Sequence, residues 1–237
     1  DTAADLPALP ITYKDFAYWQ SRQDWTNAAD YWREKLSGAP DQIALPFDHK
    51  QPDVQSYRGA HAHMRIDDDV LAGLHSLARA HNATLSAVGM ALFSAMLYRL
   101  TRQEDLVIGM GVAGREKTET EGLIGFFVNT LALRSDLSEN LSFKEFLNAV
   151  KQTTLEAYDH QLTPFEKIVD VVLNERDLST SPLFQVVFVL QNTPEESEGL
   201  NLNGIKVSSF ETNSESAKFD LTLSTYEKDN NIHLGIN

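Results

Sequence analysis

The chain has 237 residues, of which 42% are hydrophobic and 23% charged, as in a globular protein with a sizeable core. It contains no cysteine, which excludes a disulfide framework, a cysteine-ligated metal site and a thiol nucleophile. Its formal net charge of -14 argues against nonspecific binding to nucleic acid or to an anionic membrane surface, because both would repel it. No run approaches the roughly 20 apolar residues that span a bilayer, and we expect a cytoplasmic protein.

Composition divides the chain into an arm and a lobe. Residues 1–10 are polar and punctuated by proline, as in a linker, and prolines at 40, 46 and 52 mark a loop. Between them, the stretch from Trp19 to Leu36 is suited to a helix. We therefore interpret residues 1–57 as a linker and crossover arm, and residues 58–237 as the lobe that follows it. Because the chain opens without methionine, we expect it to come from a longer protein.

Periodicity predicts two strands and two helices in the first part of this lobe. Alternating residues over Arg58–Ile66 predict a strand, after which Asp67 or Asp68 can cap a helix. Thr84 can cap a second helix, whose apolar residues cover more than one stripe, so we expect it to be buried in the core. The glycine-punctuated, β-branched run Asp105–Ala113 predicts a buried strand.

Caps and apolar runs mark the elements of the second half. Ser142 and Glu145 form an S-x-x-E capping box that opens a helix. Thr163 and Glu166 repeat this spacing, with Pro164 at the first helical position, and predict another helix start. Further strands are predicted over Phe127–Arg134, Leu183–Leu190, Ile205–Phe210, Phe219–Tyr226 and Ile232–Ile236. The pattern indicates an α/β lobe.

Patterns that would carry chemistry are weak. His61 and His63 would share one face of a strand, but no third metal ligand is near them, so we expect no metal site. The glycines at 109, 111 and 114 have the spacing of a dinucleotide-binding loop, but no helical pattern follows them. No G-x-S-x-G elbow and no Walker loop occurs. The residues alone therefore indicate a globular lobe without an assigned reaction.

Four separated segments, taken in order, resemble the later signature motifs of nonribosomal peptide synthetase condensation domains. They are Tyr13–Trp19 (YKDFAYW), Ile124–Arg134 (IGFFVNTLALR), His160–Glu166 (HQLTPFE) and Arg176–Gln185 (RDLSTSPLFQ). The motif positions that match are Tyr13, Asp15, Trp19, Gly125, Phe127, Asn129, Pro164, Phe165, Glu166, Arg176, Asp177 and Pro182. Leu162 stands where the family usually has aspartate, and Ser181 where it has asparagine. Because Lys218–Leu223 (KFDLTL) also resembles a late strand of the family, the resemblance covers nearly the whole chain.

The resemblance implies a fold like chloramphenicol acetyltransferase, in which two similar α/β lobes form a V around the reaction site. We expect a lobe of this kind, a mixed β-sheet packed with helices. The family's catalytic signature, H-H-x-x-x-D-G, lies upstream of the tyrosine-led motif, and the string does not occur in this chain. We therefore expect the C-terminal lobe of such a domain, truncated at its end, with no catalytic residue of its own and no activity alone.

The implied reaction of the complete domain is amide formation. The amine of a carrier-bound acceptor aminoacyl group attacks the thioester of a carrier-bound donor, as in the biosynthesis of peptide antibiotics. No cofactor binds directly, since the substrates ride on the phosphopantetheine of peptidyl carrier proteins. The expected partners are the missing N-terminal lobe, the carrier proteins and an adjacent adenylation domain, with neither nucleic acid nor membrane. The alternatives are a noncatalytic carrier-protein docking module and an epimerisation or cyclisation relative.

Three residues are candidates for the substrate tunnel, and each has a structural alternative. Asn129 offers an amide that would face the substrate or brace the sheet. Gln185 lies on a predicted buried strand, where its amide needs either structural partners or pantetheine. Arg115 follows the end of a strand, where it would meet a phosphate or carboxylate of the substrate, or else a neighbouring acid.

The remaining motif residues are expected to serve the structure. Large aromatic side chains such as Tyr13, Phe16 and Trp19 would pack the arm against the lobe. Arg176 and Asp177 would hold a turn before the strand at Leu183, and His160 would cap a helix end or accept a hydrogen bond from a backbone N–H.

Overall fold

A computed structural model describes residues 8–52, 54–139, 141–173, 180–191, 215–228 and 231–237. The predicted strand Ile205–Phe210 and the motif residues Arg176 and Asp177 lie outside these ranges.

The described strands form one mixed sheet of six. The strands are β1 (Ala62–Ile66), β2 (Asp105–Val112), β3 (Asn129–Asp136), β4 (Val186–Gln191), β5 (Leu221–Lys228) and β6 (Asn231–Ile236), in the spatial order β1-β6-β5-β4-β2-β3. The pairs β2–β4 and β4–β5 are parallel, and the other neighbours are antiparallel. This arrangement confirms the expected mixed sheet, and it leaves β3 and β1 as its edges.

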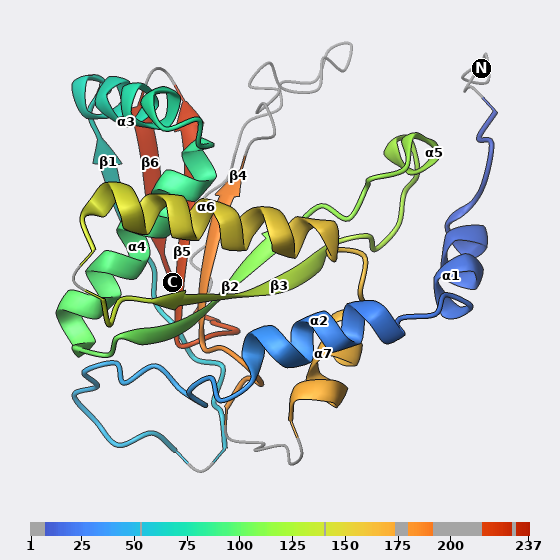
Figure 1. Cartoon of the computed structure of the whole chain (residues 1–237), viewed down its shortest axis with the longest axis horizontal. Helices are drawn as coiled ribbons and strands as arrows, with labels where there is room; N and C mark the ends of the chain where they lie inside the picture. The colour runs from blue at the N-terminus through green and yellow to red at the C-terminus, as the bar shows by residue number, and fades with distance from the viewer. Residues whose placement is uncertain (1–7, 53, 140, 174–179, 192–214, 229–230) are drawn as a thin grey trace.

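Seven helices of the described residues surround the sheet, and several of them pack on its strands. They are α1 (Tyr13–Ser21), α2 (Thr26–Leu36), α3 (Asp68–Ala80), α4 (Leu85–Thr101), α5 (Thr118–Glu121), α6 (Phe143–Asp159) and α7 (Phe165–Val172). Helix α6 packs on β3 and on α4, α4 packs on β2 and β4, and α3 packs on α4 and β6. Figure 1 shows α2 beside α7, and α1 and α5 on the side of the molecule away from β1. No single helix among the described residues is long and apolar enough to cross a membrane, and α3 and α4 reach that length only as a pair bent by 107°.

The arm contributes to the core of the lobe. Trp32 and Leu36 of α2 and Ile43 of the following loop belong to the main cluster of buried apolar side chains, and only 1% of Trp32 is exposed. Helix α4 supplies much of the same core, which confirms that it is buried. Because burial of apolar area is the main favourable contribution to folding, the second half of the arm folds as part of the lobe.

Two of the predicted helix starts are confirmed. The Thr84 hydroxyl accepts a 3.1 Å hydrogen bond from the backbone N–H of Ala87 at the start of α4. At α6 the capping box is complete, since the Ser142 hydroxyl accepts from the Glu145 N–H and the Glu145 carboxylate accepts from the Ser142 N–H. Local side-chain chemistry is sufficient to fix both boundaries.

The capping box predicted at Thr163 is wrong. Pro164, not Thr163, is the N-cap of α7, and no side chain in the described part of the protein caps this helix. The Thr163 backbone N–H donates to the carbonyl oxygen of His160, and its own carbonyl oxygen accepts from the Asn129 side chain. Thr163 is therefore held in the turn that follows α6, and its buried hydroxyl has no hydrogen-bond partner among the described residues.

Several predicted boundaries also move, among them the starts of β4 and β5, which begin at Val186 and Leu221 rather than at Leu183 and Phe219. The stretch Trp19–Leu36 is split between α1 and α2, and just before α2 the Asp24 carboxylate accepts hydrogen bonds from the N–H and hydroxyl of Thr26, the first residue of that helix. Strand β1 begins at Ala62, while Arg58 makes only an isolated bridge to Ser216. Strand β3 begins at Asn129, because the preceding residues leave the sheet toward α1.

Candidate functional site

Three of the motif segments, distant in sequence, line one pocket of about 340 Å³. It lies between α1, the start of β3 and the turn from α6 to α7. Its lining is formed by Tyr13, Phe16, Gln20, Gly114, Phe126, Phe127, Val128, Asn129, Thr130, Gln161, Leu162, Pro164, Phe165 and Glu166. Mostly apolar walls with a few fixed polar groups are typical of a ligand site, so this pocket, which we call the motif pocket, is the candidate functional site.

Helix α1 forms one wall and is held at its start by Asp15. The Asp15 carboxylate accepts 2.8 and 2.7 Å hydrogen bonds from the backbone N–H and the hydroxyl of Thr12. These bonds lower the pKa of Asp15 below its ordinary value, and the bond from the Thr12 hydroxyl has the larger effect. The motif aspartate therefore orients the helix that carries Tyr13, whose hydroxyl donates to the Phe126 carbonyl oxygen.

An aromatic cluster joins this helix to the segment before β3. Phe16 and Phe127 are buried, with ring centroids 4.8 Å apart, and Trp19 packs on Phe16 at 5.7 Å. Tyr13 meets the Phe127 ring edge-on at 5.1 Å. These contacts confirm that the motif aromatics pack the arm against the lobe.

Glycine is required where the segment before β3 passes close to the end of β2. A Cβ atom on Gly114 would lie 2.0 Å from the Phe127 carbonyl oxygen, and the residue has a φ of +66°. The third glycine of the G-x-G-x-x-G string therefore serves a close backbone approach in the pocket wall.

Asn129 connects the sheet to the turn that closes the pocket. Its side-chain nitrogen donates 2.8 and 2.7 Å hydrogen bonds to the carbonyl oxygens of Gln161 and Thr163. Asn129 thus has a structural role, and because it also lines the pocket, its contact with a substrate stays a prediction. Gln20 and Gln161 line the pocket as well, and neither was identified as a candidate from the sequence. Helical periodicity does not distinguish Gln20 from other polar residues of α1, and the only indication for Gln161 is its position in the third motif.

Arg115 lies beside the pocket but has partners of its own. Its guanidinium stacks on the Phe127 ring, 4.2 Å from the centroid, and donates to the carbonyl oxygens of Thr120 and Glu121 at the end of α5. A cation at a helix C-terminus is favoured by the helix dipole. Its partners among the described residues are thus backbone carbonyls and a ring rather than a neighbouring acid, and its contact with a substrate anion stays a prediction.

Gln185 is a buried brace, with only 3% of its surface exposed. Its side-chain oxygen accepts from the Ile43 N–H at 3.3 Å, and its nitrogen donates to the carbonyl oxygens of Asp41 and Ser181 at 3.0 Å each. The amide therefore ties the arm to the segment before β4. In the same segment Leu183, after Pro182, has a φ of +67°, in the left-handed region.

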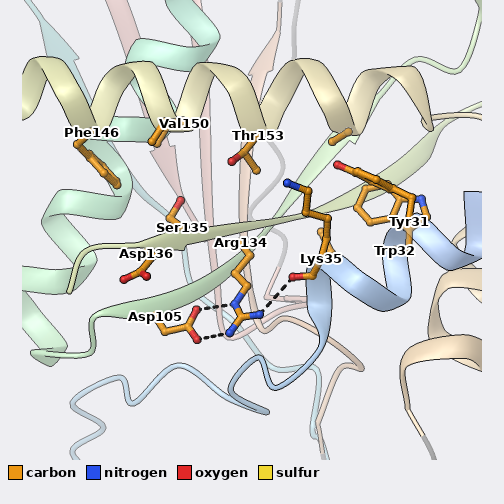
Figure 2. A pocket seen from close by; sticks show the side chains of 13 residues that line it. Tyr31, Trp32, Lys35, Asp105, Arg134, Ser135, Asp136, Phe146, Val150 and Thr153 are labelled. Carbon is orange, nitrogen blue, oxygen red and sulfur yellow. Dashed lines mark hydrogen bonds and ion pairs between the residues drawn. The ribbon is translucent and has the colours of Figure 1, made fainter. Parts of the chain in front are cut away.

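A second cavity, of about 240 Å³, lies between α2, α6 and β3 (Figure 2). Its central group is Arg134, the arginine that closes the second motif, which donates to both oxygens of Asp105 at 2.9 and 2.7 Å. The same guanidinium donates to the carbonyl oxygens of Lys35, Ser37 and Gly38 at the end of α2. The hydrogen bond to Asp105 is the main cause of the raised pKa of Arg134. Because its donors are occupied, Arg134 fastens α2 to the sheet.

His63 lies in β1 and His61 just before it, and among the described residues no third metal ligand joins them. The rings of His61 and His63 lie parallel with centroids 6.4 Å apart, and His61 contacts the Asn237 amide at 3.2 Å. Within the described ranges, no three His, Asp or Glu side chains are arranged to hold a metal ion. His160 is the C-cap of α6, as expected, and its ring stacks on Tyr31 at 4.0 Å.

Comparisons with known proteins agree on one family. The family model described as Condensation domain matches residues 2–237. A linear gramicidin synthase from Brevibacillus parabrevis is 47% identical over 236 residues, which are 97% of this chain and 5% of that protein. Tyrocidine synthase 3 from the same organism is 40% identical over 236 residues, which are 98% of this chain and 4% of that protein. The chain thus spans a small part of the curated relatives that it matches.

Solved structures share the fold. A four-domain nonribosomal peptide synthetase bound to AMP and glycine superposes with a TM-score of 0.88 at 26% identity, covering 99% of this chain and 19% of that one. The X-domain from teicoplanin biosynthesis, in complex with OxyB, superposes with a TM-score of 0.87 at 25% identity, covering 99% of this chain and 54% of that chain. These similarities confirm the expected chloramphenicol acetyltransferase-like lobe.

Proposed function

The chain belongs to the condensation-domain family, and from that premise we propose that it is the C-terminal lobe of a nonribosomal peptide synthetase domain that forms peptide bonds. In this proposal residues 58–237 form the lobe, and residues 1–57 are the linker and crossover arm. Helix α2 of the arm packs into the core of the lobe. The N-terminal lobe, absent from this chain, supplies the catalytic histidine motif, so the chain alone is inactive.

The reaction requires two tethered substrates to meet. The amine nitrogen of the acceptor aminoacyl group forms a bond to the thioester carbon of the donor, the carbon–sulfur bond breaks, and the donor's phosphopantetheine thiol takes up the proton. Both phosphopantetheines belong to carrier proteins, and no other cofactor takes part. Because holding two reactants in contact supplies a large part of such a rate enhancement, the lobe acts mainly by shaping one side of the tunnel.

The observation that carries the proposal is the convergence of three motif segments on the motif pocket. Tyr13, Asn129 and Glu166 are far apart in sequence, yet all three line it. Three of the four motifs by which the chain resembles the family therefore meet at one place, and we propose that this place is a wall of the substrate tunnel. Asn129 is the tunnel residue in this proposal, while Gln185 and Arg115 position the elements around it.

An exposed apolar loop beside the pocket is consistent with an interface to a second lobe. Ile124 and Phe126 are 97% and 78% exposed, and Val128 is exposed as well, whereas Leu123 and Phe127 in the same loop are buried. Contiguous apolar side chains exposed in this way are typical of a protein interface. We propose that this loop docks on the missing N-terminal lobe, and that carrier proteins and an adenylation domain bind elsewhere on the complete assembly.

The proposal is tested with the complete domain. Two carrier proteins are loaded with a donor acyl group and an acceptor amino acid, and the amide product is measured by mass spectrometry. The complete domain is expected to transfer the donor to the acceptor carrier without added ATP or metal. A complete domain that binds both loaded carriers and forms no amide would contradict the proposal.

One observation favours a second candidate, a partner-binding module without condensation activity. The structural neighbour from teicoplanin biosynthesis is an X-domain solved in complex with OxyB. If this chain belongs to a domain of that kind, the complete domain binds a partner protein stably but leaves both loaded carriers unchanged in the same assay.

A further inference from the structure

The second cavity, which lies between α2, α6 and β3, combines an apolar wall with polar groups (Figure 2). Its volume is about 240 Å³, which is room for roughly eight water molecules. The apolar wall is formed by Ala132, Phe146, Ala149, Val150 and Ala157. An apolar wall that faces a few fixed polar groups is typical of a site for a small molecule.

Three hydroxyl groups in this cavity are unpaired. Ser135 is only 6% exposed, and Figure 2 shows its hydroxyl directed from β3 toward α6. The hydroxyls of Thr153 and Tyr31 enter the cavity from α6 and from α2. None of the three has a hydrogen-bond partner among the residues that the structure describes. Because a buried hydroxyl without a partner costs free energy, the cavity is suited to a ligand that supplies hydrogen bonds.

The charged groups of the lining leave two poles. The guanidinium of Arg134 uses its five N–H groups on both oxygens of Asp105 and on three backbone carbonyl oxygens. That pair is therefore not available to a ligand. The remaining charges of the lining are those of Lys35 and Asp136, which Figure 2 shows on either side of Ser135.

Both poles keep unused hydrogen-bonding capacity. Lys35 pairs with Glu156 at 2.5 Å, and because an ammonium has three N–H donors, this single carboxylate leaves donors for a ligand. Asp136 accepts a 2.8 Å hydrogen bond from the N–H of Ser138. Hydrogen bonds from Ser138, first from its side chain and then from its N–H, lower the pKa of Asp136, so its carboxylate is charged at neutral pH. In the described part of the chain, no cation forms an ion pair with it.

The balance of charge favours a ligand that carries both signs. Two cations and two carboxylates line the cavity, so its formal charge is zero. Burial, followed by the negative charges of Glu156 and Asp159, raises the pKa of Tyr31. Those negative charges would repel a simple anion, and Lys35 would repel a simple cation. A zwitterion has no net charge and can meet both poles.

We infer that the second cavity binds a free α-amino acid with an apolar side chain. Its carboxylate accepts hydrogen bonds from Lys35 and the nearby hydroxyls, its ammonium donates to Asp136, and its side chain packs on the apolar wall. This inference goes beyond the proposed function and does not depend on it. Because α2 belongs to the arm, a bound amino acid would hold the arm against the lobe and stabilise the fold.

Three probes that differ at one charged group test the inference on the chain alone. They are leucine, isocaproate, which lacks the amine of leucine, and leucinamide, in which an amide replaces the carboxylate. At about pH 6.5 the amines of leucine and leucinamide are protonated. Dissociation constants are measured by NMR titration. The indole N–H signal of Trp32 reports the cavity, and those of Trp19 and Trp25, which do not line it, serve as references.

Leucine is expected to shift the Trp32 signal and to bind about two- to fivefold more tightly than either truncated probe, since partly exposed charge pairs contribute modestly. Equal affinities of the three probes would overturn the inference. So would leucine binding without a shift of the Trp32 signal, or no binding at about 20 mM leucine.

Matched variants assign each charge to its pole. Lys35→Met removes the ammonium and should weaken leucine and isocaproate by about two- to fivefold without weakening leucinamide. Asp136→Asn keeps an oxygen for Ser138 and should weaken leucine and leucinamide without weakening isocaproate. Lys50→Met and Asp48→Asn, at exposed positions of the arm, are the controls and should change none of the three affinities. A cavity variant that weakens all three probes equally, or controls with the same effects, would contradict the inference.

Discussion

The phenolic hydroxyl of Tyr13 donates a 2.9 Å hydrogen bond to the backbone carbonyl oxygen of Phe126, 113 residues further along the chain. This bond joins the first motif to the second. Gly125 makes the approach possible, because a Cβ atom there would lie 2.3 Å from the Tyr13 ring and 2.9 Å from the Phe127 ring.

Gly125→Ala is therefore expected to displace Tyr13 and destabilise the lobe. Overpacking of this kind costs about 1–3 kcal/mol, measured as the free energy of unfolding in urea. Gly122→Ala is the control, because no described atom lies within 4 Å of its added Cβ, and a change within about 0.5 kcal/mol is expected. Equal losses in the two variants would show that the Tyr13 contact does not depend on Gly125.

Asn129→Ala is expected to loosen the turn between α6 and α7. The carbonyl oxygens of Gln161 and Thr163 would lose their donors, which costs about 1–3 kcal/mol of unfolding free energy. In the complete domain, the same change is expected to lower condensation by more than the loss of folded protein accounts for, because the pocket also loses its acceptor oxygen. The control Asn148→Ala removes an exposed amide of α6 and should leave stability and activity unchanged. Activity that falls only in step with the folded fraction would confine Asn129 to a structural role.

Gln185→Ala is expected to act through stability alone. The Ile43 N–H would lose a buried hydrogen bond, and the carbonyl oxygens of Asp41 and Ser181 would each lose a partly buried one. A loss of about 1–3 kcal/mol is expected in thermal or urea unfolding. For the part of the variant that remains folded, condensation by the complete domain should be unchanged. A large loss of activity without loss of stability would instead place Gln185 at the substrate.

The contrast between local and nonlocal features explains what the sequence could predict. The caps at Thr84 and Ser142 and the buried strand at Asp105–Ala113 depend on neighbours in sequence, and these predictions were confirmed, with the strand ending at Val112. The same spacing gave no capping box at Thr163, whose N–H donates to the His160 carbonyl oxygen and whose carbonyl oxygen accepts from Asn129, a residue 34 positions earlier. No periodicity encodes that contact. The motif pocket likewise arises from long-range contacts, and only the resemblance to the family grouped its residues in advance.

Asp220 provides a test of pH dependence. Burial raises its pKa above the ordinary value of 3.8, although a 3.0 Å hydrogen bond from the Gln51 amide opposes the shift. A carboxyl with a raised pKa in the folded state binds its proton more tightly folded than unfolded. The chain therefore loses stability as the pH rises from 3.8 through the higher folded pKa.

Asp220→Asn keeps an acceptor for Gln51 and removes the charge. Its melting temperature is expected to exceed that of the parent at about pH 7, and the difference should shrink toward zero at about pH 3. Asp48→Asn, at an exposed position, is the control and should show no such trend. A variant less stable than the parent at neutral pH would indicate that the ionised carboxylate is stabilised in the fold.

If this chain is one lobe of a condensation domain, mixing it with the other lobe should restore amide formation. The chain and a separately produced N-terminal lobe are combined in a titration, and amide formation between two loaded carrier proteins is measured at each ratio. We expect no product above background from the chain alone, and product that rises and saturates as the N-terminal lobe is added. Product formed by the chain alone, or none from a complex of the two lobes shown to be assembled, would contradict the claim.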